Sequence, residues 1–400
     1  MDYQPLLARR AAREAPALFR AGAASPPGII PLTYGFPDPG SFPIEELIET
    51  AAHMLRRQGR DALQYGPIAG PPPFVDLVLA KLGAEGLRVS AQNLLVTVGG
   101  SQGIDLVTHL LVDPGDVVIV EAPTFIGALQ TFRNAEADLQ EVPLDDGGLD
   151  PDALEALLER LAREGRRAKL IYTIPTFHNP AGVTLTRERR ERLVALAARH
   201  RVMVLEDDAY SELRYDGQPL PSLYSLDGEG LVFQVRTFSK ILAAGLRLGY
   251  LVAPAALMAR LLVLKVDVGT SPFVGHLAAA FAGREPGQLD RLAAHVERLI
   301  GIYRGRRDAL LGALAEYAPP DVSWTHPVGG FFTWVTLPPG MDAGALLPRA
   351  AESGVSYIPG ASYFARGDGT RHLRLAFSFL PPEDLVEGVR RLCRTIEGAR

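Results

Sequence analysis

The fold of this chain is decided by the stretch RTFSKILAAGLRLG, residues 236–249. An apolar run at 230–235 leads into it and another at 248–253 leads out, and both have the length and composition of buried strands. Lys240 therefore sits in a polar loop between two buried elements, beside hydroxyl side chains. Such a lysine is either a surface charge or an amine held in a dry site. In a dry site, desolvation lowers its pKa and makes it a nucleophile toward carbonyl groups.

Strand and helix patterns alternate on the N-terminal side of this stretch. Strand-type apolar runs occur at 94–98, 117–121, 139–142, 169–173 and 202–206. Helix-type patterns occur at 44–58, 101–112, 124–134, 151–163 and 187–200, and a proline-rich turn is expected at 71–73. Regular alternation of this kind predicts an α/β fold with a mostly parallel sheet covered by helices on both faces. Ligands of such sheets bind at the carboxyl ends of the strands.

Length and composition limit the function. A chain of 400 residues is too long for one simple core, so two unequal lobes are expected. The net charge of −5, without a basic block, argues against nucleic acid as the main partner. The single cysteine, Cys393, excludes a disulfide framework and a multi-thiolate metal centre. Neither a secretory signal nor a membrane span is visible, so the sequence predicts a cytoplasmic enzyme.

The pattern changes character after residue 283. A long amphipathic helix follows, and short strands and helices are expected at 330–335, 343–353, 355–358, 372–377 and 382–397. The sequence thus predicts a large domain at 44–283 and a smaller α+β domain at 284–400. Residues 1–43 are expected to form an N-terminal arm and part of the small domain, with a helix at 6–20 and, within 32–40, a short strand that runs into a loop of glycines and prolines.

An acidic cluster closes the predicted strand at 202–206. Side chains alternate faces along a strand, so Asp207 points away from the side shared by Glu206 and Asp208. One acid would then face the site, with Tyr210 close behind it.

Other polar groups follow neighbouring strands. Asn179 comes after the strand at 169–173, and Ser101 and Gln102 begin a helix whose free N–H groups favour an anion. An anion cradle, a buried lysine, an aspartate and an aromatic hydroxyl together indicate pyridoxal phosphate (PLP). Lys240 would hold its aldehyde as a Schiff base, and the aspartate would keep its pyridine nitrogen protonated.

The order and spacing of these motifs resemble the class I/II aminotransferases of PLP fold type I. The motifs are Gly100-Ser101-Gln102, Asn179-Pro180-Ala181-Gly182, Asp207-x-x-Tyr210, Ser239-Lys240, Arg247 and Leu373-Arg374-Leu375. The resemblance covers about residues 30–395 and is strongest to the 2-aminoadipate/kynurenine aminotransferase-like group, which also forms the C-terminal half of MocR-type regulators. It implies a large PLP-binding domain, whose mostly parallel sheet is sandwiched by helices, and a smaller α+β domain.

The resemblance implies a role for each residue around the cofactor ring. Lys240 would be the internal aldimine lysine and the base for the 1,3-proton shift, and Asp207 would pair with the pyridine nitrogen. Asn179 and Tyr210 would bind the phenolic oxygen. Phe125 would lie against the ring face.

It also implies how the phosphate and the substrate are held. The implied phosphate ligands are Ser101, Gln102, Thr237, Ser239 and Arg247. Arg374 would grip the substrate α-carboxylate as a planar fork, next to Asn179, and Gly35 would lend a backbone contact near the substrate. Tyr65 resembles the tyrosine that reaches across a dimer interface to the neighbouring subunit's phosphate, so a homodimer with shared sites is implied.

The sequence departs from the family at positions that concern the substrate. Ala181 replaces the usual threonine, and Phe125 replaces the usual tyrosine. An arginine in the N-terminal helix can bind a distal carboxylate in relatives that take acidic side chains. Arg20 is the nearest candidate here and Leu18 competes with it, so acidic specificity is left open. His178 is expected to pack or to support a neighbour rather than to catalyse.

The sequence therefore predicts a PLP-dependent aminotransferase. It would move an amino group between an α-amino acid and a 2-oxo acid, through a Lys240 aldimine and pyridoxamine phosphate. The alternative is a fold-type I enzyme with another outcome: β-elimination, decarboxylation, oxidation or cyclisation, because PLP makes the same carbanion in several of these. A non-catalytic PLP-binding sensor is disfavoured, since Lys240, Asp207 and Arg374 are all present.

Overall fold

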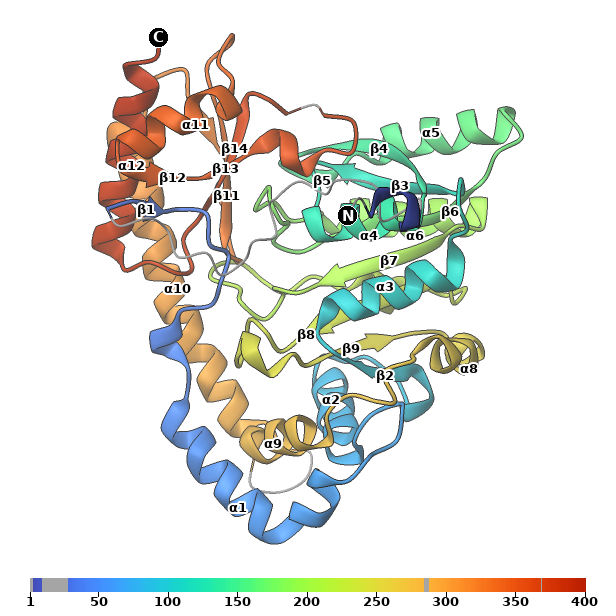
Figure 1. Cartoon of the computed structure of the whole chain (residues 1–400). Helices are drawn as coiled ribbons and strands as arrows, with labels where there is room; N and C mark the ends of the chain where they lie inside the picture. The colour runs from blue at the N-terminus through green and yellow to red at the C-terminus, as the bar shows by residue number, and fades with distance from the viewer. Residues whose placement is uncertain (1–2, 9–27, 284–287, 368) are drawn as a thin grey trace.

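The computed structural model describes residues 3–8, 28–283, 288–367 and 369–400. The candidate Arg20, the competing Leu18 and most of the predicted helix at 6–20 lie outside these ranges. The described chain forms a large lobe around an extended sheet and a smaller lobe rich in C-terminal elements (Figure 1).

The large lobe is built on an eight-stranded sheet with the order β2-β9-β8-β7-β6-β3-β4-β5. The strands are β2 (Leu94–Thr97), β3 (Val117–Ala122), β4 (Asp138–Asp145), β5 (Gly148–Leu149), β6 (Ala168–Thr173), β7 (Met203–Asp208), β8 (Val232–Thr237) and β9 (Gly249–Val252). Strands β4, β3, β6, β7 and β8 run parallel, whereas β9 is antiparallel to both β8 and β2. The carboxyl ends of β2, β6, β7 and β8 therefore meet at one edge of the sheet. The predicted mostly parallel sheet is confirmed.

Helices cover both faces of this sheet. One face packs on α3 (Gly100–Leu111), α4 (Ile126–Asn134) and α8 (Ala255–Leu264), and the other packs on α5 (Pro151–Arg163) and α6 (Arg187–His200). Alternate residues of each central strand enter the two cores: Leu205 lies on the α3 side and Val204 on the α6 side. Burial on both faces explains why these strands are continuous apolar runs in the sequence.

The small lobe contains a four-stranded antiparallel sheet with the order β10-β11-β14-β13. Its elements are β10 (Ser323–Trp324), β11 (Phe332–Thr336), β13 (Ile358–Pro359), β14 (His372–Ala376), α10 (Asp290–Tyr317), α11 (Ala343–Glu352) and α12 (Pro382–Glu397). Near the chain start, β1 (Ile30–Pro31) pairs in parallel with β12 (Val355–Ser356), so blue and red segments lie together in Figure 1. This pairing supports the assignment of part of residues 1–43 to the small domain, and the exact boundaries stay a prediction.

The predicted turn at 71–73 is wrong, because α2 (Pro72–Ala84) begins there. Proline is tolerated in the first turn of a helix, where its missing N–H has no intrahelical partner. The helix expected at 44–58 is longer than predicted, since α1 spans Ile44–Leu63 with a kink at Gln58. Helix α9 (Pro272–Ala282), which packs against α1, was not predicted.

The short strand expected to begin at residue 32 is also displaced. Strand β1 ends at Pro31, and the following residues form a loop. Their carbonyl oxygens serve the cavity instead: Thr33 accepts a hydrogen bond from Arg374, and Gly35 accepts one from Lys240.

The described residues contain neither a bilayer-spanning helix nor a cluster of metal-binding side chains. None of the helices in these ranges is both long enough and apolar enough to cross a bilayer. The same part of the chain holds no group of three or more His, Cys, Asp or Glu side chains placed to bind a metal ion.

Candidate active site

A cavity of about 590 Å³ opens where the strand ends of the large sheet face the small lobe. Most of the predicted site residues line it: Gly35, Ser101, Phe125, Asn179, Asp207, Tyr210, Thr237, Ser239, Lys240, Arg247 and Arg374. The structure thus brings together residues from distant parts of the chain. Gln102 and Tyr65, also predicted, do not line the cavity.

Lys240 lies in the cavity wall just after β8. Its Nζ donates a hydrogen bond of 3.3 Å to the carbonyl oxygen of Gly35 and lies 5.9 Å from the ring centroid of Tyr210. Burial, together with the cationic Arg374 and Arg247, lowers the pKa of Lys240 from 10.5 to about 8. A substantial fraction of the amine is then neutral near physiological pH and can attack an aldehyde.

Asp207 lies near the end of β7 and faces the cavity, as the strand alternation predicts. Its neighbours face elsewhere: Glu206 accepts a hydrogen bond from the N–H of Leu223, and Asp208 forms a 2.8 Å ion pair with Arg236. Burial raises the pKa of Asp207 from 3.8 to about 6. A buried carboxylate of this kind is stabilised by a cationic ligand in the cavity, and a protonated pyridine ring meets that requirement.

The phosphate-type cradle lies at the N-terminus of α3. Ser101, Thr237, Ser239 and Arg247 line this end of the cavity, where free N–H groups of the helix favour an anion. Gly99 has a φ of +73°, and a Cβ at this position would lie 2.7 Å from Nη2 of Arg247. Glycine is therefore needed to keep the arginine close to the helix end, and the donors present suit a phosphate.

The side chain of Gln102 turns away from this cradle. Its Nε2 donates a 2.8 Å hydrogen bond to Asp267, and its Oε1 accepts one from the N–H of Val98. Of the polar groups of Gln102, the main-chain N–H in the first turn of α3 is the one positioned to bind an anion. Tyr65 is 85% exposed and lies outside the cavity, so its predicted role requires a second copy of the chain.

Arg374 lies on β14 at the opposite end of the cavity and is only 7% exposed. Nη1 donates to Oδ1 of Asn179 at 3.1 Å, and Nη2 donates to the carbonyl oxygen of Thr33 at 2.7 Å. The guanidinium lies 4.2 Å from the ring centroid of Phe332 and 5.4 Å from that of Tyr363. Its buried Nε has no hydrogen-bond partner among the described residues. A buried arginine with an unused donor suits a carboxylate ligand.

Aromatic residues that the sequence reading did not single out form another wall. The rings of Tyr34 and Phe36 stack with centroids 5.3 Å apart, and Phe379 packs edge-on against both. Tyr34 and Phe36 flank Gly35, and this juxtaposition is the signal in the sequence that could have identified them. The apolar lining of the cavity also includes Ile126, Phe332, Leu347, Tyr357, Ile358 and Tyr363.

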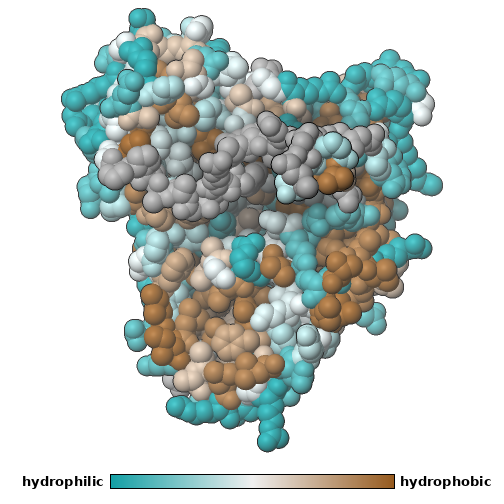
Figure 2. Space-filling model, viewed as in Figure 1, coloured by the Kyte–Doolittle hydropathy of each residue, from teal (hydrophilic) through white to brown (hydrophobic). Residues whose placement is uncertain are grey.

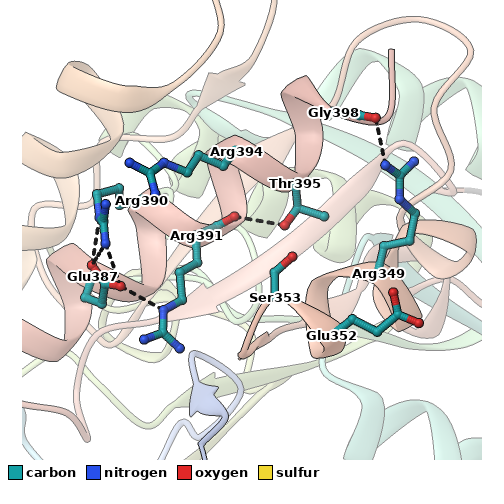
Figure 3. A pocket seen from close by; sticks show the side chains of 9 residues that line it. All are labelled: Arg349, Glu352, Ser353, Glu387, Arg390, Arg391, Arg394, Thr395 and Gly398. Carbon is teal, nitrogen blue, oxygen red and sulfur yellow. Dashed lines mark hydrogen bonds and ion pairs between the residues drawn. The ribbon is translucent and has the colours of Figure 1, made fainter.

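A second hollow lies on the surface of the small lobe, between α11 and α12 (Figure 3). It is lined by four arginines, and three of these side chains are already held. Arg390 and Arg391 bind the carboxylate of Glu387, and Arg349 donates to the carbonyl oxygen of Gly398. The hollow contains no lysine, histidine or aspartate among its lining residues. We therefore assign the chemistry to the cavity at the strand ends.

Comparison with known proteins identifies the family of this chain. The family model of aminotransferase class I and II matches residues 27–392. The chain belongs to this family. The aromatic-amino-acid aminotransferase 1 of Thermococcus litoralis is 41% identical over 373 residues, covering 92% of this chain and 88% of the relative. The 2-aminoadipate transaminase of Thermus thermophilus is 38% identical and covers 93% of this chain and 91% of the relative.

Solved structures of aminotransferases match the whole chain. The kynurenine aminotransferase of Pyrococcus horikoshii, solved with PMP, has a TM-score of 0.93 at 36% identity, with coverage of 100% of this chain and 98% of that one. The α-aminoadipate aminotransferase of Thermus thermophilus, complexed with a phosphopyridoxyl-leucine, has a TM-score of 0.91 at 35% identity. This aminotransferase therefore uses PLP and transfers an amino group between an α-amino acid and a 2-oxo acid. The alternatives of elimination, decarboxylation, oxidation and cyclisation are not favoured.

Proposed function

We propose that this aminotransferase takes α-amino acids with aromatic or large aliphatic side chains as its amino donors. The observation that carries this proposal is the wall formed by Tyr34, Phe36, Leu347, Tyr357 and Ile358. Burial of an apolar substrate side chain against such a wall is favourable. The wall has no group that would offset the cost of burying a charged side chain.

The cations of the cavity support the same conclusion. In the described part of the chain they are Arg236, Lys240, Arg247 and Arg374. Arg236 is already paired with Glu85 and Asp208. The other three are assigned below to the cofactor and to the α-carboxylate, so none of the four is left for a distal carboxylate.

The names of the relatives point in more than one direction. The Thermococcus litoralis protein is named for aromatic amino acids and the Pyrococcus horikoshii protein for kynurenine, whose side chains are aromatic. The Thermus thermophilus relative is named for 2-aminoadipate, which carries a distal carboxylate. The aromatic wall favours the first group.

We assign the binding of PLP to residues of the large domain. Asp207 would pair with the pyridine nitrogen, Asn179 and Tyr210 would bind the phenolic oxygen, and Phe125 would cover a ring face. The phosphate ligands would be Ser101, Thr237, Ser239, Arg247 and the main-chain N–H of Gln102. When bound, PLP supplies an electron-withdrawing ring that stabilises negative charge on the substrate Cα.

The reaction then depends on Arg374, Lys240 and the loop at 33–36. Arg374 orients the amino acid by its α-carboxylate, as a planar fork suited to that anion. Lys240 Nζ takes the proton from the substrate Cα, and its lowered pKa near 8 suits an amine that must accept and release protons. The stacked rings of Tyr34 and Phe36 line the cavity on either side of Gly35 and would limit the access of water to a bound substrate.

We also propose that the active form is a homodimer. Ile44, Ile48 and Leu55 lie on one stripe of α1 and are each at least 38% exposed, and Val266 is 86% exposed. Figure 2 has brown surface over α1, α9 and α8, as expected of a face that another subunit covers. The exposed Tyr65 would reach the phosphate of the neighbouring subunit. A cytoplasmic location stays a prediction.

The substrate proposal can be tested by half-reactions. The PLP-loaded enzyme is mixed with single amino acids in the absence of any 2-oxo acid, and the visible absorbance of the cofactor is followed as it changes to its amino form. We expect phenylalanine, tyrosine, kynurenine and leucine to react with higher kcat/KM than glutamate or 2-aminoadipate. Faster reaction of the acidic substrates would overturn the proposal and direct attention to Arg20.

A further inference from the structure

Tyr172 Oη donates a hydrogen bond of 2.7 Å to Oδ2 of Asp207. The two residues lie on neighbouring parallel strands, β6 and β7, and face the side of the sheet covered by α3 and α4. Tyr172 is completely buried, and its ring packs edge-on against Phe132 of α4, with centroids 5.4 Å apart. The phenol does not line the cavity, so it approaches Asp207 from behind.

The contact with Phe132 restrains the ring of Tyr172, so its hydroxyl stays directed at Asp207. Among the described residues, no other side chain donates a hydrogen bond to the carboxylate of Asp207. Oδ2 is thus occupied from within the protein, while Oδ1 has no such protein donor and Asp207 faces the cavity. A carboxylate held by one oxygen from a rigid core position presents its other oxygen in a fixed direction.

A separate buried pair lies beside this contact. Glu121 accepts a 3.0 Å hydrogen bond from Nε2 of His178, because Nδ1 of that ring already accepts the N–H of Ala181. Glu121 also accepts hydrogen bonds from Thr173 and from the N–H of Ile174. The hydrogen bonds of this pair do not involve Asp207, so Tyr172 is the one described side chain that donates a hydrogen bond to Asp207.

We propose that Tyr172 is a positioning residue that aims the Asp207 carboxylate at the cofactor ring and stabilises its negative charge. The proposal rests on the assignment of Asp207 to the pyridine nitrogen made above. It gives a role in the reaction to a residue that the sequence presents as an ordinary core tyrosine.

The electrostatics of Asp207 support this role. Burial raises its pKa to about 6, and the hydrogen bond from Tyr172 is the largest influence in the opposite direction. Asp208 and Glu121 raise the pKa of Asp207 further, and His178 lowers it. Without the phenol the pKa of Asp207 would rise, and a larger fraction of the acid would be neutral between pH 6 and 8. A neutral acid stabilises a protonated pyridine nitrogen less than a carboxylate does.

The phenol itself stays a neutral donor over the working range. Burial, and then the charge of Asp207, raises the pKa of Tyr172 well above 10. The remaining titratable groups that face Asp207 are Tyr210 and Lys240, whose pKa values respond to its charge. Neither group is altered by a substitution at position 172.

Tyr172→Phe removes the hydroxyl alone and tests the proposal. We expect the cofactor-free variant to bind PLP about 10- to 100-fold more weakly, the range for a lost hydrogen bond to a charged group. With ¹⁵N-labelled PLP, NMR should show the pyridine nitrogen losing its proton at a pH lower by about one unit. The matched control is Tyr215→Phe, which removes a buried hydroxyl that donates to the carbonyl oxygen of Gly330, away from Asp207. The control should leave both quantities unchanged.

A double-mutant cycle separates positioning from a general loss of stability. In an Asp207→Ala background, Tyr172→Phe should change the PLP affinity by less than about twofold, since the interaction is already gone. An equal loss in both backgrounds, or a wild-type pH midpoint in Tyr172→Phe, overturns the role of Tyr172. Wild-type PLP affinity in Asp207→Ala overturns instead the assignment of Asp207 on which the proposal rests.

Discussion

Nη1 of Arg374 donates a 3.1 Å hydrogen bond to Oδ1 of Asn179, a residue 195 positions earlier in the chain. The arginine belongs to β14 of the small lobe, and the asparagine follows β6 of the large sheet. The group proposed for the substrate carboxylate is thus held by a group proposed for the cofactor. With these proposed roles, one contact between the lobes would align the substrate with the cofactor.

Removal of Arg374 should mainly weaken substrate binding. Arg374→Ala is expected to lower kcat/KM, mostly through a higher KM. The fall should correspond to a loss of about 2–5 kcal/mol of transition-state stabilisation, the range for a broken charge pair in a desolvated site. Arg374→Lys should not restore activity, because an ammonium cannot replace the planar fork. The control is Arg371→Ala, since Arg371 is exposed and, among the described residues, its guanidinium donates only to the carbonyl oxygen of Leu337. Wild-type KM in Arg374→Ala would refute the assignment.

Lys240 should control both turnover and cofactor capture. Lys240→Ala is expected to abolish transamination, and any activity above background in that variant contradicts the mechanism. In the wild type, only the neutral amine attacks the aldehyde of PLP. The rate constant for PLP capture by the cofactor-free protein should therefore rise with pH, with a midpoint near the pKa of about 8, and level off above it. Stopped-flow absorbance measures this profile, and a rate that is flat between pH 6 and 9 would be inconsistent with it.

Asp207 should reduce the stability of the cofactor-free protein. Its folded pKa of about 6 exceeds the ordinary 3.8, so folding is penalised whenever the group is ionised. Asp207→Asn should raise the free energy of unfolding by on the order of 2–3 kcal/mol above pH 6. The gain should disappear as the pH falls from 6 toward 3.8, where the wild type is also protonated. Urea unfolding at pH 7.5 and pH 4 measures the difference.

The neighbouring acid provides a contrast. Asp208 is ion-paired with the buried Arg236, so Asp208→Asn leaves a charge poorly compensated and should destabilise the protein. Stabilisation by both substitutions, or by neither, contradicts this account of the strand end.

The exposed stripe of α1 should govern association. Leu55→Glu places a charge on the proposed interface and should convert the dimer to a monomer, as measured by sedimentation equilibrium. Val328→Glu is the matched control, because Val328 is also 38% exposed but lies in the small lobe. If Tyr65 serves the neighbouring phosphate, Leu55→Glu should also weaken PLP binding. A dimer that persists in Leu55→Glu removes the support for this interface.

The framework of the site could be predicted because it depends on local rules. Buried strands form continuous apolar runs, and alternation along β7 separates Asp207 from Glu206 and Asp208, after which the family resemblance identifies Asp207 as the residue that faces the site. The loop with Lys240 could be found because it interrupts two such runs. Each of these signals lies within a few residues of the position that it identifies.

Other features depend on contacts between distant segments, which the sequence does not display. Tyr172 has the appearance of a core residue until β7 is placed beside β6. The side chain of Gln102 turns to Asp267, a partner 165 positions away. Pro72 was interpreted as part of a turn because proline breaks helices in general, and only the packing of α2 shows that it opens one.

The loop at 33–36 holds Lys240 and Arg374 through the carbonyl oxygens of Gly35 and Thr33. These contacts require the path of the backbone and no particular side chain at positions 34 and 36. Position 35, between them, does require glycine, because a Cβ there would lie 2.5 Å from the ring of Phe332. The side chains at positions 34 and 36 can therefore be varied in a library while the carbonyl contacts to Lys240 and Arg374 are kept. In this loop the backbone supports the residues proposed for the chemistry, whereas the side chains contribute to the wall proposed to select the substrate.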